Sequence, residues 1–327
     1  TVISADPEDT RQRHGVEAIP WLSVGAIWSA VRKADLLISG GGSLLQNVTS
    51  GRSLYYYLSV ILLARLAGTP VMLYAQGIGP VCGGFARWLM TAISRRVARI
   101  TVRDYGSLEE LRSLNITQPP SEVTADPVLA IHPVDRGIGR AILTKYKAAG
   151  AKPVVGISVR EWRGWSGYKK AIAAAAGEIA REFEARVIFL PMQYPEDVET
   201  ARKIAAQAGE PMIVLDEEYT TSELLSIVGN LDLLISIRLH GLIFAGVMGV
   251  PMVGISYDPK IDRFLDSIDE KPAADLKTAT VENIMAAVRE KWANRKNEAE
   301  QREGRLAELR RLAARNAELA LELIEKM

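Results

Sequence analysis

The chain has 327 residues, of which 48% are hydrophobic and 24% charged, and this composition is that of an ordinary globular protein with room for two domains. Its net charge of +1 gives no electrostatic basis for a nucleic-acid partner. The single cysteine, Cys82, excludes an internal disulfide and any multi-cysteine metal site. With no secretory signal and no apolar run of the roughly 18 residues that a membrane span needs, we expect a cytoplasmic protein.

The first half alternates short apolar runs with segments of helical length, which is typical of a parallel α/β sheet. We predict strands at 36–39, 71–74 and 100–102, and helices at about 53–67, 86–98 and near 107. The chain starts abruptly at an apolar run without methionine, so we expect that an earlier strand has been left out. We assign residues 1–145 to a first domain, with a helix or linker over 137–151.

The same alternation restarts after this linker and defines a second domain at residues 150–300. Strands are predicted at 154–159, 186–190, 212–215, 233–237 and 252–256, and helices at 168–184, 195–208, 221–229 and 240–248. From about residue 281 the chain is predicted to be helical to its end, with 301–327 packing across the domains. We therefore expect two doubly wound domains that face one cleft, with ligand at the carboxyl ends of the strands.

A glycine-rich turn follows the first predicted strand and precedes a helix. Glycines at Gly40, Gly41 and Gly42 allow the backbone to approach an anion or a sugar closely, although tight-turn geometry alone also explains them. Neither the dinucleotide pattern G-x-G-x-x-G nor a phosphate-binding P-loop is present.

The strongest group of polar residues ends the predicted strand at 233–237 and opens a helix. Arg238 suits a phosphate or carboxylate, and His240 can carry a proton. Residues two apart on a strand point the same way, so both side chains are expected to converge on one ligand. The other histidines, His14 and His132, lie in polar or proline-flanked stretches and are interpreted as incidental.

Two further cations follow strands of the second half. Arg160 comes directly after the strand at 154–159, where an anion would lie, and Trp162 follows it. Lys260 follows the strand at 252–256. A surface arginine and an exposed turn lysine are the alternative interpretations of these two residues.

At these residues the sequence resembles the polysaccharide pyruvyl transferase family, most closely the bacterial enzymes that pyruvylate secondary cell-wall polymer. The matching segments occur in family order and span most of residues 36–265. They are Ser39 to Gln46, Ala75 to Pro80, Val102 to Asp104, Thr124 to Pro127, Ser158 to Arg160 and Arg238 to Gly241.

The resemblance implies a GT-B-like fold of two Rossmann-like domains, with the C-terminal helix returning to the first domain. It implies that phosphoenolpyruvate is the donor, bound in the second domain, and that no cofactor or metal is needed. The donor-binding residues would be Arg160, Arg238, Lys260 and Gly241, with His240 and Arg238 as the catalytic pair. The acceptor-binding residues, in the first domain, would be Gly40, Gly41, Gly42, Gln46 and Gln76.

The implied acceptor is a lipid-diphosphate-linked disaccharide that ends in N-acetylmannosamine and receives a 4,6-linked pyruvate ketal. Such modified polymers anchor S-layer proteins, and a lipid-linked acceptor would bring the enzyme transiently to the inner membrane face. One departure from the family pattern is Asn47, which stands where relatives often carry aspartate.

Two other functions stay open at this point. A nucleotide-sugar glycosyltransferase of the same fold would use a carboxylate after a second-domain strand to bind ribose, and the run Asp216 to Glu218 offers one. A non-catalytic sugar- or phosphate-binding module is the second alternative, although the presence of both Arg238 and His240 argues against it.

Overall fold

The computed structural model describes residues 1–48, 51–295 and 298–326, and the remaining residues, including the terminal Met327, lie outside this description. The chain divides into two compact units, residues 1–127 with 311–327 and residues 128–310. Every described strand pair in both units runs parallel, as the alternation of short strands and helices predicted.

The second unit contains one six-stranded sheet. Its strands are β7 (Val154–Ser158), β8 (Arg186–Phe189), β9 (Ile213–Val214), β10 (Leu233–Ser236), β11 (Met252–Ser256) and β12 (Ala274–Asp275). They lie in the order β12-β11-β10-β7-β8-β9, so the chain starts in the middle, moves to one edge and returns to the middle. This reversal between β7 and β10 makes the sheet doubly wound, as expected.

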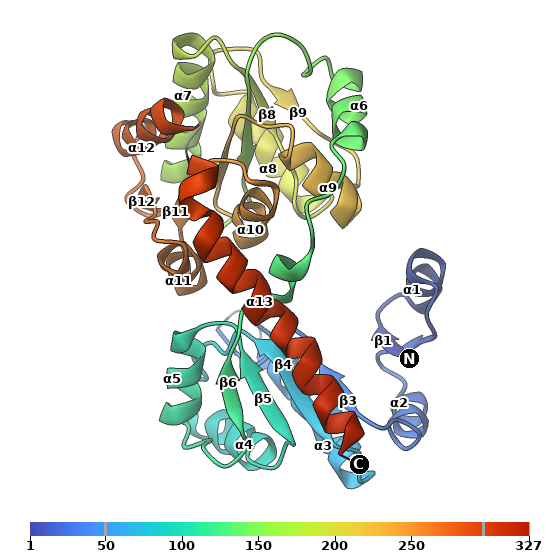
Figure 1. Cartoon of the computed structure of the whole chain (residues 1–327). Helices are drawn as coiled ribbons and strands as arrows, with labels where there is room; N and C mark the ends of the chain where they lie inside the picture. Colours follow the sequence, from blue (N-terminus) through green and yellow to red (C-terminus); the bar gives the residue numbers. More distant parts are fainter. Residues whose placement is uncertain (49–50, 296–297, 327) are drawn as a thin grey trace. The chain divides into compact units, whose positions relative to one another are not determined.

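Helices cover both faces of this sheet (Figure 1). They are α6 (Gly137–Lys145), α7 (Gly167–Glu182), α8 (Glu196–Ala205), α9 (Thr221–Val228), α10 (Leu239–Met248), α11 (Pro259–Ser267) and α12 (Val281–Asn294). Leu233 and Ile235 of β10 pack in an apolar cluster with residues of α7 and α12. Ser236 of the same strand contacts Gly241 of α10. Because neighbouring strand residues point to opposite faces, α10 covers the face opposite α7 and α12.

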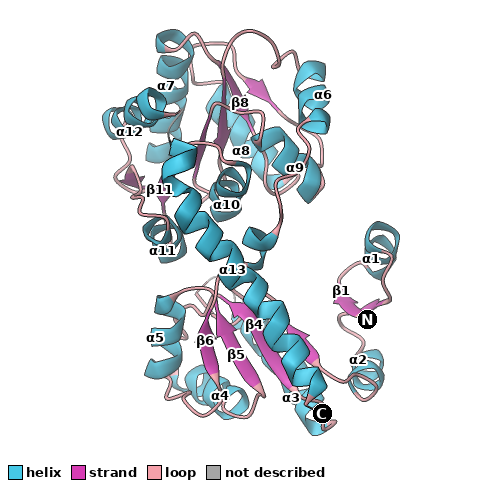
Figure 2. Cartoon of the chain, viewed as in Figure 1, coloured by secondary structure: helices cyan, strands magenta, loops and turns pink. Residues whose placement is uncertain are grey.

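The first unit has a four-stranded sheet and a separate two-stranded one (Figure 2). The larger sheet has the consecutive order β3 (Leu37–Ser39), β4 (Val71–Gln76), β5 (Arg99–Val102) and β6 (Ser121–Val123), and the smaller one pairs β1 (Val2–Ser4) with β2 (Ala18–Pro20). The helices are α1 (Pro7–His14), α2 (Val24–Val31), α3 (Gly51–Leu66), α4 (Gly84–Ser94) and α5 (Tyr105–Ser113). The apolar core of this unit lies between β3–β5 and helices α2 to α5.

The other face of the larger sheet is covered by α13 (Glu298–Glu325), whose residues from Arg311 onward belong to the first unit. Leu319 and Ala320 pack on Met72 of β4 in a small buried cluster. Figure 1 shows this part of the helix lying along the sheet.

A fully buried asparagine of α13 also joins this helix to the sheet by hydrogen bonds. Asn316 accepts from the hydroxyls of Thr101 at 2.6 Å and Thr124 at 2.8 Å. Its amide nitrogen donates to the carbonyl of Ala125 at 3.2 Å. These bonds fix the rotation of α13 on the sheet, because a turned helix would lose all three of them.

Several elements differ from the predicted ones. The sequence pattern did not reveal the short strands β1, β2, β6 and β12, or α1, which buries none of its residues. The alternative interpretation of Lys260 as an exposed turn lysine does not hold, because Lys260 lies in the first turn of a helix that Asp258 caps and Pro259 begins. Residues 137–145 were assigned to the first half, whereas the structure groups them with the second unit. The reason is that α6 packs on α9, where the Gly139 amide donates to the Ser226 hydroxyl at 2.7 Å.

Among the described helices, none has both the length and the apolar composition of a membrane span.

We expect Asn316→Ala to lower the free energy of unfolding of the first unit by about 2–3 kcal/mol, because the buried hydroxyls and carbonyl that it pairs with lose their partner. Urea denaturation measures this difference. Asn294→Ala is the matched control: Asn294 is exposed, donates only to the Glu290 carbonyl of its own helix, and should cost less than about 0.5 kcal/mol. An equal loss in both variants would contradict the structural role of Asn316.

Candidate active site

The two arginines selected from the sequence leave neighbouring strands at the same edge of the second sheet. Ser158 of β7 and Ser236 of β10 are direct partners in the parallel ladder, and Arg160 and Arg238 each follow two residues later. The sheet order reverses between these two strands, which is where doubly wound folds bind ligands. Burial lowers the pKa of Arg238, and the nearby positive charge of Arg160 lowers it further. The structure therefore brings the two guanidinium groups together.

Arg160 is held by an aromatic cradle. Its Nη1 donates to the hydroxyl of Tyr257 at 3.0 Å, and its guanidinium carbon lies 5.3 Å and 5.5 Å from the ring centroids of Trp162 and Tyr257. The hydroxyl of Tyr168 donates to the Arg160 carbonyl at 2.7 Å. Within the described residues, the buried Arg160 Nε and Ser158 hydroxyl make no hydrogen bond. These two groups are thus buried polar groups without a partner in the described structure.

Lys260 shares the aromatic ring of this cradle. Its ammonium lies 5.3 Å from the centroid of Tyr257 and 3.5 Å from the carboxylate of Asp258. Tyr257 therefore connects Lys260 to Arg160, since the same ring contacts both cations. The first turn of α11 thus brings a third positive charge to the carboxyl edge of β11, next to β10.

Arg238 is held by a different pair of side chains. Its Nε lies 3.5 Å from Oδ2 of Asp197, and its Nη2 donates to Oε1 of Gln193 at 3.3 Å. Burial raises the pKa of the Asp197 carboxyl, whereas the charges of Arg238 and Arg160 oppose this shift. Both partners belong to the segment that follows β8, so four adjacent strands, β11, β10, β7 and β8, contribute to one edge.

The histidine and glycine after Arg238 lie on the helix and not on the strand. β10 ends at Ser236 and α10 begins at Leu239, so the alternation expected to align Arg238 with His240 does not apply there. His240 is exposed in the first turn of α10, with its ring centroid 6.4 Å from that of Phe244. A side chain at Gly241 would meet the Ser236 hydroxyl at 2.6 Å, so this glycine allows close packing of helix on strand.

The glycine turn of the first unit is fixed by a buried glutamine. Gln76 at the end of β4 is fully buried, and its amide nitrogen donates to the carbonyls of Ser39, at 3.0 Å, and of Gly40. The Gly77 amide donates to the Gly42 carbonyl at 2.7 Å. Gly42 has a φ of +112°, which favours glycine. Gln76 therefore positions the turn, whereas the sequence analysis expected it to bind the acceptor.

A buried arginine joins three of the motifs in this unit. Arg103 donates to Asp126 at 3.2 Å and to the hydroxyl of Ser43 at 3.0 Å. Its guanidinium occupies the space that a side chain at Gly77 would need, with a closest approach of 2.6 Å. The motifs around residues 43, 103 and 126 are thus parts of one hydrogen-bonded group.

Gln46 and Asn47 order the segment after the turn. Gln46 accepts a hydrogen bond from the Val48 amide at 2.8 Å and packs tightly on Gly79. The Asn47 amide donates to the Cys82 carbonyl at 2.7 Å and accepts from the Cys82 amide at 2.8 Å. An aspartate could not make the first of these bonds, which accounts for asparagine at this position.

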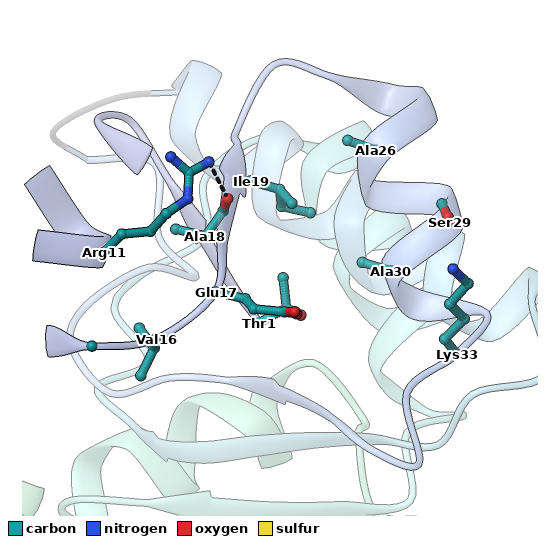
Figure 3. A pocket seen from close by; sticks show the side chains of 11 residues that line it. Thr1, Arg11, Val16, Glu17, Ala18, Ile19, Ala26, Ser29, Ala30 and Lys33 are labelled. Atoms are coloured by element: carbon teal, nitrogen blue, oxygen red, sulfur yellow. Dashed lines mark hydrogen bonds between the residues drawn. The ribbon is translucent and has the colours of Figure 1, made fainter. Parts of the chain in front are cut away.

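Two cavities lie near the N-terminus of the first unit. One, with a volume of about 710 Å³, is bordered by α1, β2 and α2, and there Arg11 donates to the Ala18 carbonyl at 3.0 Å (Figure 3). The other, about 1040 Å³, is bordered by β1, β3, α2 and α3. Neither lining includes a cation selected from the sequence.

In the part of the chain that the structure describes, no three His, Cys, Asp or Glu side chains gather in a way that could hold a metal ion.

The comparison with protein families identifies the family of this chain. The model of the family "Polysaccharide pyruvyl transferase" matches residues 1–259, which is most of the chain. The chain belongs to this family. Comparison with curated proteins finds no matching sequence.

Solved structures with the same fold as this chain have very different sequences. Staphylococcus aureus MnaA with UDP is 13% identical, with a TM-score of 0.65, and the match covers 92% of this chain and 81% of that one. A putative UDP-N-acetylglucosamine 2-epimerase from Listeria monocytogenes is 12% identical, with a TM-score of 0.67 and coverage of 98% and 87%. HepE of Anabaena with UDP is 13% identical, with a TM-score of 0.64 and coverage of 97% and 88%. At these identities the likeness shows the GT-B-like fold alone.

Two of the carboxylates considered for ribose binding, Asp216 and Glu217, are engaged elsewhere in this chain. Asp216 accepts from the Tyr146 hydroxyl at 2.7 Å and from Arg202 at 2.6 Å. Glu217 forms an ion pair with Lys145. These contacts tie the segment after β9 to α6 and α8, and they give no support to a nucleotide-sugar site there.

The sequence patterns did not identify the residues that hold the cations of the candidate site. Asp197 and Gln193 follow a strand end, which was the only available signal, and they belong to no motif. Tyr257 lay in a segment singled out only for its lysine. Arg103 and Asp126 were noted as family motifs without a role.

Gly241→Ala should lower the free energy of unfolding of the second unit by about 1–3 kcal/mol, because the added methyl group would displace the Ser236 side chain, which hydrogen bonds the Arg238 backbone. Thermal or urea denaturation measures this. Gly304→Ala serves as the control, since Gly304 is helical with open space around it and alanine there should stabilise by up to about 1 kcal/mol. Equal stability of the Gly241 variant and the parent protein would show that this contact is not restrictive.

Proposed function

We propose that the protein transfers the enolpyruvyl unit of phosphoenolpyruvate to a lipid-linked cell-wall glycan and forms a 4,6-pyruvate ketal on N-acetylmannosamine. The observation that carries the proposal is the pair of guanidinium groups, Arg160 and Arg238, at the ends of the paired strands β7 and β10. Phosphoenolpyruvate carries a phosphate and a carboxylate on one carbon, so its site requires several fixed cations. Family membership supports the donor and a polysaccharide acceptor.

In this proposal the second unit binds the donor. Arg160, Arg238 and Lys260 supply positive charge for the phosphate and carboxylate, and the unpaired Arg160 Nε and Ser158 hydroxyl supply donors. Gly241 contributes the start of α10, where backbone N–H groups favour an anion. The aromatic cradle keeps Arg160 in place before the donor arrives, which reduces the entropic cost of binding.

We assign His240 as the acid that protonates the methylene carbon of the donor. Protonation makes the central carbon electrophilic, and a hydroxyl oxygen of the acceptor forms a bond to it. The bond from that carbon to the phosphate oxygen then breaks, and the second hydroxyl closes the ketal. The two hydroxyl protons are balanced by the proton gained by the methyl group and the one carried away by phosphate. Cations beside the phosphate stabilise the charge of the leaving group.

The first unit is proposed to bind the acceptor. The backbone of Gly40, Gly41 and Gly42 can approach a sugar closely, and Gln46 lies directly after this turn. Gln76 keeps the turn in its conformation through the hydrogen bond of its side chain to the Ser39 carbonyl. The lipid-linked acceptor would bring the enzyme to the cytoplasmic membrane face, and its product would serve the secondary cell-wall polymer that anchors S-layer proteins.

We expect Arg160→Ala and Arg238→Ala each to raise the dissociation constant for phosphoenolpyruvate about 10- to 100-fold, because each removes charge-assisted hydrogen bonds to the donor. Isothermal titration calorimetry on the folded variants measures this. Arg181→Ala, in the last turn of α7 and paired with Glu210, removes the same charge from the surface and should leave the constant unchanged. Unchanged donor binding in either site variant would remove that arginine from the site.

His240→Ala should abolish transfer, with a rate loss of about 10²- to 10⁴-fold, while the exposed position leaves the fold intact. The assay follows release of phosphate and addition of pyruvate mass to a synthetic lipid-linked acceptor. His132→Ala, at another exposed histidine of the same unit, should keep full activity. Turnover of the His240 variant near the parent rate would mean that another group supplies the proton.

A further inference from the structure

We infer that Asp197 is a positioning residue for the transfer reaction, which fixes the guanidinium of Arg238 so that its remaining nitrogen faces the donor. The inference rests on the proposed function, since it concerns how one of the donor-binding cations is held. It assigns a role to a carboxylate that neither the sequence motifs nor the family resemblance selected.

Asp197 is itself immobilised. It lies in the first turn of α8, and its side chain is only 3% exposed. Its Oδ2 accepts hydrogen bonds from the backbone amides of Met192 at 3.1 Å and Gln193 at 2.9 Å. These bonds tie the Asp197 carboxylate to the backbone between β8 and α8. The position of the carboxylate is therefore set by this backbone and does not follow movements of the Arg238 side chain.

Two of the three guanidinium nitrogens of Arg238 contact this part of the chain, one through an ion pair with Asp197 and one through a hydrogen bond to Gln193. Nε lies 3.5 Å from Asp197 Oδ2, and Nη2 donates to Gln193 Oε1 at 3.3 Å. Nη1 makes no hydrogen bond to the described residues. Because the guanidinium is a rigid planar group, fixing two nitrogens also fixes the direction of the third. Nη1 is therefore presented in one orientation.

The charges explain why a carboxylate is needed at this place. Arg160 and Arg238 follow partnered residues of adjacent strands, and each positive charge disfavours the other. Asp197 interacts favourably with both guanidinium groups. Without its negative charge, the two side chains would reduce their repulsion by turning away from each other, and the arrangement that suits a doubly anionic donor would be lost.

Asp197→Asn tests this role because it preserves shape and removes the charge. Loss of orientation weakens donor binding, whereas loss of a negative charge near the anion strengthens it, so the dissociation constant should change by less than about threefold. The two effects do not cancel in kcat. We expect kcat to fall about 10- to 100-fold, because the Arg238 guanidinium is misplaced in the transition state. A kcat within twofold of the parent value overturns the inference.

A double-mutant cycle separates positioning from a purely structural role. Lysine at position 238 has neither Nε nor the planar fork, so Asp197 has little left to orient. In the Arg238→Lys background, Asp197→Asn should therefore lower kcat by less than about twofold. If Asp197 only supports the start of α8, Asp197→Asn will lower kcat by the same factor in the Arg238→Lys background as in the parent protein. That result would contradict the proposal. Asp216→Asn, which breaks an aspartate–arginine pair outside the site, should leave kcat unchanged in both backgrounds.

A measurement without substrate keeps this test independent of the proposed function. Exchange of the Arg238 Nε proton with water, followed by NMR on the intact protein, should be about tenfold or more slower in the parent than in Asp197→Asn. Equal exchange rates would overturn the inference. If the parent protein shows slow exchange but neither binds phosphoenolpyruvate nor releases phosphate from it, the positioning of Arg238 stands and the proposed donor is wrong.

Discussion

The pairing of β7 with β10 is the constraint on which the candidate site depends. Backbone hydrogen bonds between these strands fix Ser158 opposite Ser236, and the two arginines that follow are forced to share one edge of the sheet. Burial lowers the pKa of Arg238, and the positive charge of Arg160 lowers it further, so this placement disfavours the charged form of Arg238. Such a placement costs folding free energy and is tolerated only where neighbouring groups offset it.

The groups that offset this cost come from the two strands that flank the β7–β10 pair. On one side, β11 contributes Tyr257, whose ring and hydroxyl receive Arg160. On the other side, the segment after β8 contributes Asp197, which balances the charge of Arg238. Each arginine thus takes its partner from the strand that flanks the other arginine, because β11 lies beside β10 and β8 lies beside β7. The cations are held in place before a ligand binds, and this placement lowers the stability of the fold. Such a loss of stability is common at functional sites.

The sequence predicted the parts of this arrangement that depend on local pattern. Short apolar strands that alternate with helices gave the fold class, and strand ends gave Arg160 and Arg238. It did not predict Asp197, because a helix begins after a six-residue segment there and no periodicity relates residue 197 to residue 238. Nor did it predict that Gln76 is buried beneath the glycine turn, since the family resemblance implied an acceptor-binding residue at this position. Contacts between distant segments depend on tertiary packing, which single-sequence patterns do not contain.

The hydrogen bonds of Asn316 have a consequence for how the protein is made. Thr101 lies 215 residues before its partner, so the sheet of the first unit acquires these buried contacts only after residue 316 has been synthesised. The second unit, as the structure describes it, ends at residue 310 and therefore precedes the segment that covers the face around Met72. The first unit thus cannot complete its buried contacts before the second unit has been synthesised, although most of its own strands come first in the sequence.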